Sequence, residues 1–310
     1  MVTRALTIVR PGMLTTVQDL GRWGYQAVGV PVAGPMDWYA HRLANSRVHN
    51  PPSAAALEIT LLGPELLAEG EITCAVAGAE FDVRVNERSI DPAQPFVLRA
   101  GDRLRFGERR AGARTTLAAA GGFDVASVLG SRATSLISRM GPFGGRALKA
   151  GDRLPVAESS LSSPLAAGAP LPVPVGGARL RVLFGPHERR FTEQARRTLS
   201  NARFTVTPES NRMGYRLAGP ALDRADTSEM LSDATPVGSL QVPPSGEPIL
   251  LMADRQTTGG YPKIATVITA DMPLAGQLAP GDWIEFEVCT ADGAINALLE
   301  REAALRGTPR

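Results

Sequence analysis

Cysteine, lysine, aromatic residues and long apolar runs are all scarce in this chain of 310 residues. The two cysteines, Cys74 and Cys289, lie far apart in apolar, β-like runs. This pattern favours buried thiols in a reducing compartment over a disulfide framework, although a single long-range bridge stays open. The first residues do not form a secretory signal, and no apolar run approaches the 18 residues of a membrane span. We therefore expect a cytoplasmic protein.

The charge balance is nearly neutral, with 33 basic and 31 acidic residues and a net charge of +2. Such a chain has no electrostatic footprint for nucleic acid or an anionic membrane surface. The apolar fraction of 44% is ordinary for a soluble globular protein. The length predicts two domains, or two halves of one architecture.

Lysine is the rarest of the charged residues, because only Lys149 and Lys263 accompany 31 arginines. An ammonium is a compact donor with a tunable pKa, whereas a guanidinium is planar and permanently charged. A position that keeps lysine in an arginine-rich chain is therefore a candidate for chemistry that needs an ammonium.

The segment 156–177 is rich in proline, glycine, serine and alanine and contains no aromatic residue. We interpret it as a linker. It separates an N-terminal half, residues 1–155, from a C-terminal half, residues 178–310.

Both halves are predicted to be mainly β, because short runs rich in Val, Ile, Thr and Phe alternate with Gly, Pro and Asp. Helical periodicity is confined to three segments. These are 36–48, 191–199 with Thr192 near its start, and a C-terminal segment capped by Asp292. Regularly spaced short strands indicate a barrel or sandwich. The expected strands are 6–9, 57–62, 72–76, 81–85, 96–99, 104–106, 115–118, 180–184, 204–207, 249–252, 264–269 and 284–288.

The densest polar segment is the loop 252–264 between two apolar strands. Glycine-rich backbone admits a ligand closely, and flanking cations suit an anion. We expect Lys263, Asp254 and Arg255 to be catalytic. The expected substrate-binding residues of the same loop are Gln256, Thr257, Thr258, Gly259, Gly260 and Tyr261. The alternative is a solvated hairpin tip with internal hydrogen bonds.

Two further clusters are candidates for binding. Arg212 and Arg216 flank Tyr215 and would clamp a carboxylate or phosphate, unless they form ion pairs with acidic neighbours. A glycine-rich stretch near the N-terminus would form a second binding loop or a contact with another subunit. Its candidate residues are Thr15, Thr16, Gln18, Asp19, Arg22 and Asp37.

Several chemistries have no signature in the sequence. There is no phosphate-binding loop of the Gly-x-x-x-x-Gly-Lys-Ser/Thr type, no Gly-x-Ser-x-Gly nucleophile elbow and no biotin-attachment sequence. The histidines, His41, His49 and His187, lack metal-ligand spacing, so no metal site is expected.

Seven motifs in order resemble one known family, the allophanate hydrolase subunit 2 or biotin-dependent carboxyltransferase family. This family includes the C subunit of 5-oxoprolinase and the Kip kinase-inhibitor antagonist. The motifs are Thr-Thr-Val-Gln-Asp from Thr15 with the Gly-Arg and Gly-Tyr pairs that follow, Gly-Val-Pro from Gly29 with Met36-Asp37, Leu-Glu-Ile-Thr from Leu57, Leu-Gly-Ser-Arg from Leu129, Arg-Met-Gly-Tyr-Arg-Leu from Arg212, Gln-Val-Pro-Pro from Gln241, and Asp-Arg-Gln-Thr-Thr-Gly-Gly-Tyr-Pro-Lys from Asp254.

The resemblance implies two cyclophilin-like β-barrel halves with a few short helices, and it adds Gln241 to the substrate-binding residues. It also implies a partner like allophanate hydrolase subunit 1, similar to the B subunit of 5-oxoprolinase or to the Kip inhibitor, and a third subunit for lactam opening. Fold alone does not choose the reaction. We expect a subunit of an ATP-dependent 5-oxoprolinase, a hydrolase of a cyclic amide in which the complex uses ATP. The alternatives are a carboxyltransferase component that uses biotin, or a regulatory antagonist of a kinase inhibitor.

Overall fold

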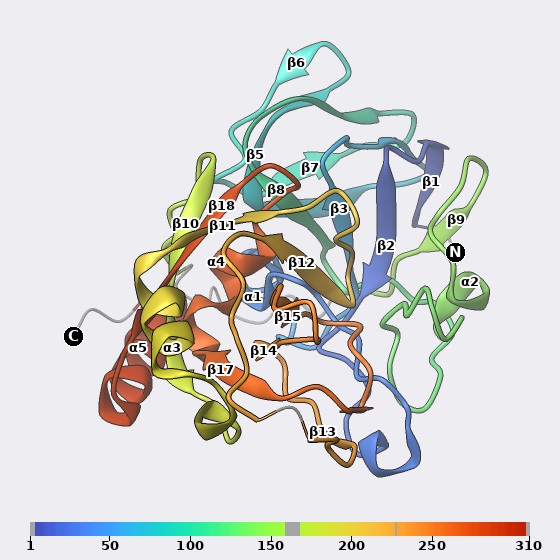
Figure 1. Ribbon diagram of the computed structural model, residues 1–310. Coiled ribbons are helices and arrows are strands. Elements are labelled where there is room, and N and C mark those ends of the chain that lie inside the picture. The colour runs from blue at the N-terminus through green and yellow to red at the C-terminus, as the bar shows by residue number, and fades with distance from the viewer. Residues whose placement is uncertain (1–3, 159–167, 227, 308–310) are drawn as a thin grey trace. The chain divides into compact units, whose positions relative to one another are not determined.

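A computed structural model describes residues 4–158, 168–226 and 228–307, and Figure 1 shows the course of the chain. The described residues are mainly β with a few short helices, which confirms the predicted fold class. No helix among them is long and apolar enough to cross a membrane.

Internal contacts divide the chain into two units, which are described separately. The first takes the chain up to Arg22, from Ala33 to Val173, and from Glu302 onward. The second takes Trp23–Val32 and Pro174–Arg301. The main boundary therefore falls inside the predicted linker, of which residues 159–167 lie outside the described part. Two short segments depart from a simple division into halves. Trp23–Val32 belongs to the second unit, and the chain from Glu302 onward belongs to the first.

The first unit is built on a nine-stranded sheet whose main path is β2-β3-β8-β4-β1-β9, with β5 on β8 and β6 and β7 on β5. One face carries the larger apolar core, which includes Leu57, Leu117 and Phe123. The opposite face carries alanines that pack under α1. The elements are β1 (Ala5–Arg10), β2 (Leu14–Gln18), α1 (Trp38–Arg47), β3 (Ala56–Thr60), β4 (Glu65–Ala68), β5 (Ile72–Val85), β6 (Arg88–Ser89), β7 (Phe96–Leu98), β8 (Arg103–Ala119), α2 (Pro142–Gly145) and β9 (Arg153–Pro155).

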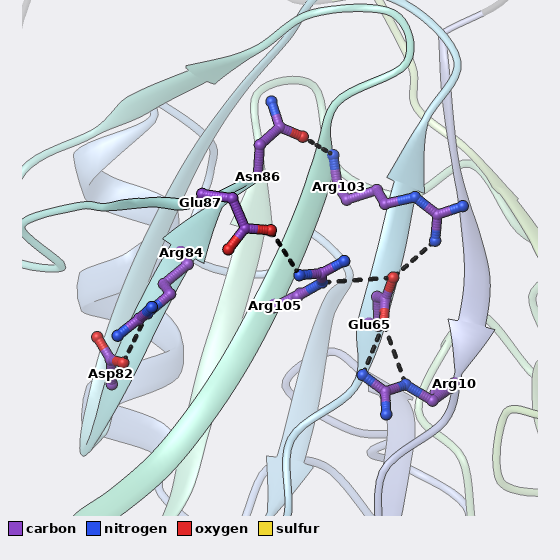
Figure 2. Close-up of polar contacts among 8 residues, drawn as sticks. All are labelled: Arg10, Glu65, Asp82, Arg84, Asn86, Glu87, Arg103 and Arg105. Carbon is purple, nitrogen blue, oxygen red and sulfur yellow. Dashed lines mark hydrogen bonds and ion pairs between the residues drawn. The ribbon is translucent and has the colours of Figure 1, made fainter.

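A charge cluster ties three strands of this sheet together (Figure 2). The carboxylate of Glu65 on β4 accepts from Arg10 on β1 at 2.7 Å and from Arg103 on β8 at 2.6 Å. The hydrogen bond from Arg103 is the main cause that lowers the pKa of Glu65. The carboxylate is nearly buried while both arginines are exposed, so the cluster orders the strands more than it stabilises the unit.

The second unit contains a closed seven-stranded barrel with the order β10-β17-β14-β15-β12-β11-β18. The barrel expected from strand spacing is thus present here, while the first unit forms an extended sheet. The barrel strands are β10 (Gly177–Phe184), β11 (Arg203–Val206), β12 (Gly214–Ala218), β14 (Ser239–Gln241), β15 (Ile249–Leu251), β17 (Lys263–Val267) and β18 (Trp283–Val288). The other elements are η1 (Gln26–Val28), η2 (Glu188–Arg190), α3 (Glu193–Asn201), η3 (Thr269–Asp271), α4 (Met272–Gly276), α5 (Ala291–Leu305) and the pair β13 (Asp233–Ala234) with β16 (Thr258–Gly259).

The helix starts follow their capping residues. The side chain of Asp37 accepts from the Ala40 N–H and caps α1, and Thr192 caps α3 as predicted. The predicted cap Asp292 is wrong by two positions, because α5 begins at Ala291. Instead, the hydroxyl of Thr290 accepts from the Gly293 N–H at 3.1 Å.

The sequence contains Gly-Asp at three places, from Gly101, Gly151 and Gly281, and all three form the same turn. Gly101, Gly151 and Gly281 each have a φ near +90°. A residue with a side chain rarely adopts this conformation, which explains the glycine. In each turn the aspartate that follows accepts from the N–H three residues before it, at 2.8 Å.

The two cysteines are free thiols. Burial raises the pKa of Cys74 to about 12, so this thiol is protonated and inert at neutral pH.

Stability of the first unit should fall between pH 7 and pH 5 because of His41. Burial in α1 lowers the pKa of His41 to about 4. In the unfolded chain His41 takes up this proton near pH 6.5, well above its pKa in the folded chain. The free energy of unfolding should therefore be about 2 kcal/mol lower at pH 5 than at pH 7. Urea unfolding at the two pH values should show this loss in the wild type and in the control His49→Gln. Equal loss in His41→Gln would assign the pH dependence to other groups.

Candidate functional site

The polar loop predicted from composition connects two barrel strands of the second unit, β15 and β17. Within it, β16 pairs with β13 in a two-stranded ribbon, so Gly259 lies opposite Asp233 and Thr258 opposite Ala234. This pairing brings a carboxylate from a distant part of the chain to the loop.

Lys263 opens β17 and is almost completely buried, with 2% of its surface exposed. Its Nζ donates to Asp233 Oδ2 at 2.8 Å and to the carbonyl of Ala234 at 2.8 Å. The Asp233 side chain is half exposed. The buried lysine stem therefore presents a fixed ammonium beside an accessible carboxylate. This hydrogen bond lowers the pKa of Asp233 below its usual range.

His187 completes this group. Its Nδ1 accepts from the Lys263 N–H at 3.3 Å, and its Nε2 lies 3.8 Å from Asp233 Oδ2. Burial, followed by the charge of Lys263, lowers the pKa of His187, so the ring is neutral at pH 7. Neither His187 nor Asp233 was a candidate from the sequence. Their positions depend on the β13–β16 register and on η2, which carry no local signal.

Asp254 and Arg212 bind each other rather than facing outward. Arg212 Nε donates to Asp254 Oδ2 at 3.0 Å and Nη2 donates to Oδ1 at 3.1 Å, with both side chains at most 5% exposed. Arg216 lies on the exposed face of β12, and Tyr215 points inward and donates to the carbonyl of Leu278. The arrangement therefore differs from the predicted clamp, because a buried arginine with a bidentate carboxylate is not available to a ligand.

Arg255 differs from its neighbours because no carboxylate of the described residues pairs with it. Its Nε donates to the carbonyl of Thr235 at 2.7 Å. Burial lowers its pKa to about 10, which still leaves the guanidinium charged at pH 7. A partly desolvated cation without a counter-charge is suited to hold an anion.

The remaining loop residues form an amide network. Gln256 Nε2 donates to Gln241 Oε1 at 3.3 Å, and Gln241 Nε2 donates to the carbonyl of Tyr261 at 3.4 Å. The structure thus joins Gln241 to the loop. Tyr261, Thr258 and Gly260 are exposed, and Thr257 and Gly259 are partly exposed.

Gly259→Ala should disturb this network. A methyl group at Gly259 would lie 2.6 Å from Gln241 Nε2, whereas at Gly260 the nearest atom is 3.8 Å away. We expect a loss of about 1–2 kcal/mol of unfolding free energy for Gly259→Ala, and a change within about 0.5 kcal/mol for the control Gly260→Ala. Urea unfolding of the two variants checks this. Equal stability would show that the network yields without cost.

The second predicted binding loop lies in the first unit and is internally bonded. Asp19 accepts from the Gly21 N–H at 2.9 Å and from the Ser131 hydroxyl at 2.6 Å. Gln18 Nε2 donates to Thr16 Oγ1 and to the carbonyl of Thr134, and Arg22 donates to the carbonyl of Ala133. Thr15 donates to the carbonyl of Pro11, and Asp37 caps α1. All six side chains are buried, which fits a structural role in fixing the segment that contains Ser131 and Thr134.

One buried carboxylate of the first unit was missed as a candidate. Glu58 lies across the sheet between Thr16 on β2 and Thr116 on β8. Its Oε2 accepts from the Met36 N–H at 2.6 Å.

Among the described residues, no three His, Cys, Asp or Glu side chains come together as a metal site requires.

Comparison with known proteins matches residues 28–288 to the carboxyltransferase domain, subdomain A and B. The chain is 39% identical to the C subunit of 5-oxoprolinase from Escherichia coli over 96% of this chain and 95% of that protein. The corresponding Haemophilus influenzae protein is 35% identical over 94% and 93%. A crystal structure of Kluyveromyces lactis urea carboxylase superposes with a TM-score of 0.92 and 33% identity over 98% of this chain and 29% of that chain.

These matches cover nearly all of the chain and confirm the resemblance seen in its motifs. The chain therefore belongs to the family of the carboxyltransferase domain, subdomain A and B, with the C subunit of 5-oxoprolinase among its relatives.

Proposed function

We propose that this protein is a subunit of an ATP-dependent 5-oxoprolinase, a hydrolase complex that opens 5-oxo-L-proline to L-glutamate in the cytoplasm. The observation that carries the proposal is the identity of 39% to the C subunit of the Escherichia coli 5-oxoprolinase over nearly the full length of both chains. The urea carboxylase match supports the family equally but covers a small part of that longer protein.

The loop chemistry of the second unit is compatible with this reaction. Opening of a lactam with ATP places phosphoryl charge on the lactam oxygen, and the substrate also carries a carboxylate. Arg255 has no carboxylate partner among the described residues and is suited to bind one of these anions. Lys263, held by Asp233, is suited to neutralise the other.

The complex should contain a subunit 1-like partner, similar to the B subunit of 5-oxoprolinase, and a third subunit for lactam opening. The two bacterial relatives are themselves single subunits of a 5-oxoprolinase, which supports the existence of further subunits here. Photolabelling of the assembled complex with an azido-ATP shows whether ATP contacts this chain or its partner.

The test is reconstitution of the three proteins with 5-oxoproline and ATP, with release of glutamate and of ADP measured. We expect glutamate formation that requires ATP and stops when this chain is omitted. Matched reactions should omit each of the three proteins in turn. Glutamate formation that is equally fast without this chain would refute the proposal.

A second candidate, carboxyl transfer from carboxybiotin supplied by another protein, is favoured by the superposition on urea carboxylase. Its test is consumption of free carboxybiotin in the presence of urea. Urea-dependent turnover with no response to 5-oxoproline would establish this candidate in place of the first.

A further inference from the structure

A cavity of about 550 Å³ opens in the first unit, away from every residue discussed above as a candidate for binding. It is bounded by the middle of β5, by the loop that follows β6, by the end of α1 and by the segment 170–173. This volume is within the range of sites for small organic ligands.

The cavity results from a bulge in β5. Gly78 has a φ of +111°, and the pairing of β5 with β8 shifts between Gly78 and Glu80. Before the bulge, Ala75 and Ala77 lie under α1. After it, Glu80 and Asp82 alternate with core residues and face outward, where α1 has already ended at Arg47. The bulge thus opens the sheet surface beside the helix end.

Arg47 supplies a buried cation to this cavity. It is 8% exposed, and its Nη1 donates to the carbonyls of Val76 and Pro92 at 2.6 and 3.2 Å. Its Nε is buried without a hydrogen-bond partner, and no carboxylate of the described residues lies within ion-pair distance of it, although the charge of Asp91 acts on it. A buried guanidinium N–H without an acceptor is costly, which indicates that an acceptor such as a carboxylate belongs beside it.

The rim of the cavity carries charges of both signs, because the exposed Arg110 lines it together with carboxylates. Glu80 and Asp91 are exposed there, and the side chain of Glu80, whose backbone pairs with Ala111 on β8, has no hydrogen bond or ion pair with any described residue. Asp82 also lines the cavity but is bonded to Arg84 at 2.8 Å, as Figure 2 shows. The walls between floor and rim are apolar, from Ile90, Leu171 and the flanking prolines.

We propose that this cavity binds a free α-amino acid with an apolar side chain. The carboxylate lies on Arg47, the ammonium faces Glu80 and Asp91, and the side chain contacts the wall formed by Ile90 and Leu171. A simple anion would leave the carboxylates of the rim unmatched, and a simple amine would leave Arg47 Nε without an acceptor. Only a ligand that carries both groups satisfies the two ends.

The experiment is calorimetric titration of the full chain with L-leucine at millimolar concentration. We expect one saturable site. The matched probes are 4-methylpentanoate, which lacks the ammonium, and isoamylamine, which lacks the carboxylate. Each should bind about tenfold more weakly or less, because a hydrogen bond to a charged group is lost. No saturable heat with L-leucine, or equal affinity for the three probes, overturns the proposal.

Variants assign the site. Arg47→Gln should weaken L-leucine binding about tenfold or more, and Glu80→Gln should weaken it about threefold. The control Glu71→Gln removes another exposed carboxylate next to the start of β5 and should leave binding unchanged. Because Arg47 also holds two carbonyls, its variant is accompanied by an unfolding curve, and Glu80→Gln decides the matter if Arg47→Gln does not fold. Unchanged binding in Glu80→Gln would place L-leucine elsewhere.

Discussion

Asp254→Asn should lower the free energy of unfolding by about 3–5 kcal/mol, because it leaves the Arg212 guanidinium buried without its counter-charge. The pair is bidentate, and the Asp254 side chain is 1% exposed. Water therefore cannot replace the carboxylate oxygen that asparagine lacks. Urea unfolding of the purified variant gives this free energy directly.

Two further variants distinguish the pair from a general effect of charge. The double variant Arg212→Met with Asp254→Leu should be more stable than Asp254→Asn, because no charge then remains buried. The control Asp226→Asn removes a carboxylate from an exposed ion pair with Arg190 and should cost at most about 1 kcal/mol. An Asp254→Asn variant that keeps its stability but loses turnover would instead support the catalytic role predicted for Asp254.

Much of the fold was predictable because apolar runs and turn residues are local signals. The strands that contain Leu57, Ile72, Ile249 and Ile284 lie where β-branched and aliphatic runs predict them. The missed strands include β4 and β12 as well as β2 and β14, and in the last two the residues are largely polar and yet buried, as at Thr16 and Gln241. A polar strand is recognisable only once its partners across the sheet are known.

The candidate loop was also predictable, but its internal geometry was not. Composition marks the loop from Asp254 to Lys263 as chemically dense. The partners of Lys263 come from positions 30 and 76 residues away in the chain, and this depends on the β13–β16 register and on η2. The same limit applies to Arg212, whose pairing with Asp254 spans 42 residues and withdraws both charges from the surface. The sequence therefore identified which residue types are concentrated in the loop. Pairing in the tertiary structure decides which of these side chains stay available to a ligand.

Lys263→Arg should reduce turnover of the reconstituted complex about 10²- to 10³-fold, the size of effect produced by loss of one transition-state donor. The expectation rests on the proposed 5-oxoprolinase reaction. The Nζ of Lys263 is fixed by two acceptors at 2.8 Å, Asp233 and the carbonyl of Ala234. A guanidinium is larger and planar, so it cannot place a single donor at the same point. Initial rates of ATP-dependent glutamate formation, per mole of folded protein, measure the loss.

The buried position of Lys263 also predicts a stability cost, so turnover and unfolding must be measured on the same preparations. The control is Lys149→Arg, which changes the only other lysine of the chain at an exposed position and should leave both quantities unchanged. Asp233→Asn keeps the lysine but removes its counter-charge. Lys263 is buried, so this variant should lose stability, but less than Asp254→Asn because Asp233 is half exposed and water replaces part of the lost interaction; it should lower turnover by positioning the ammonium less firmly. A purely structural Lys263 would lower stability in Lys263→Arg while turnover per folded molecule stays at the wild-type value, and that result would remove Lys263 from the catalytic machinery.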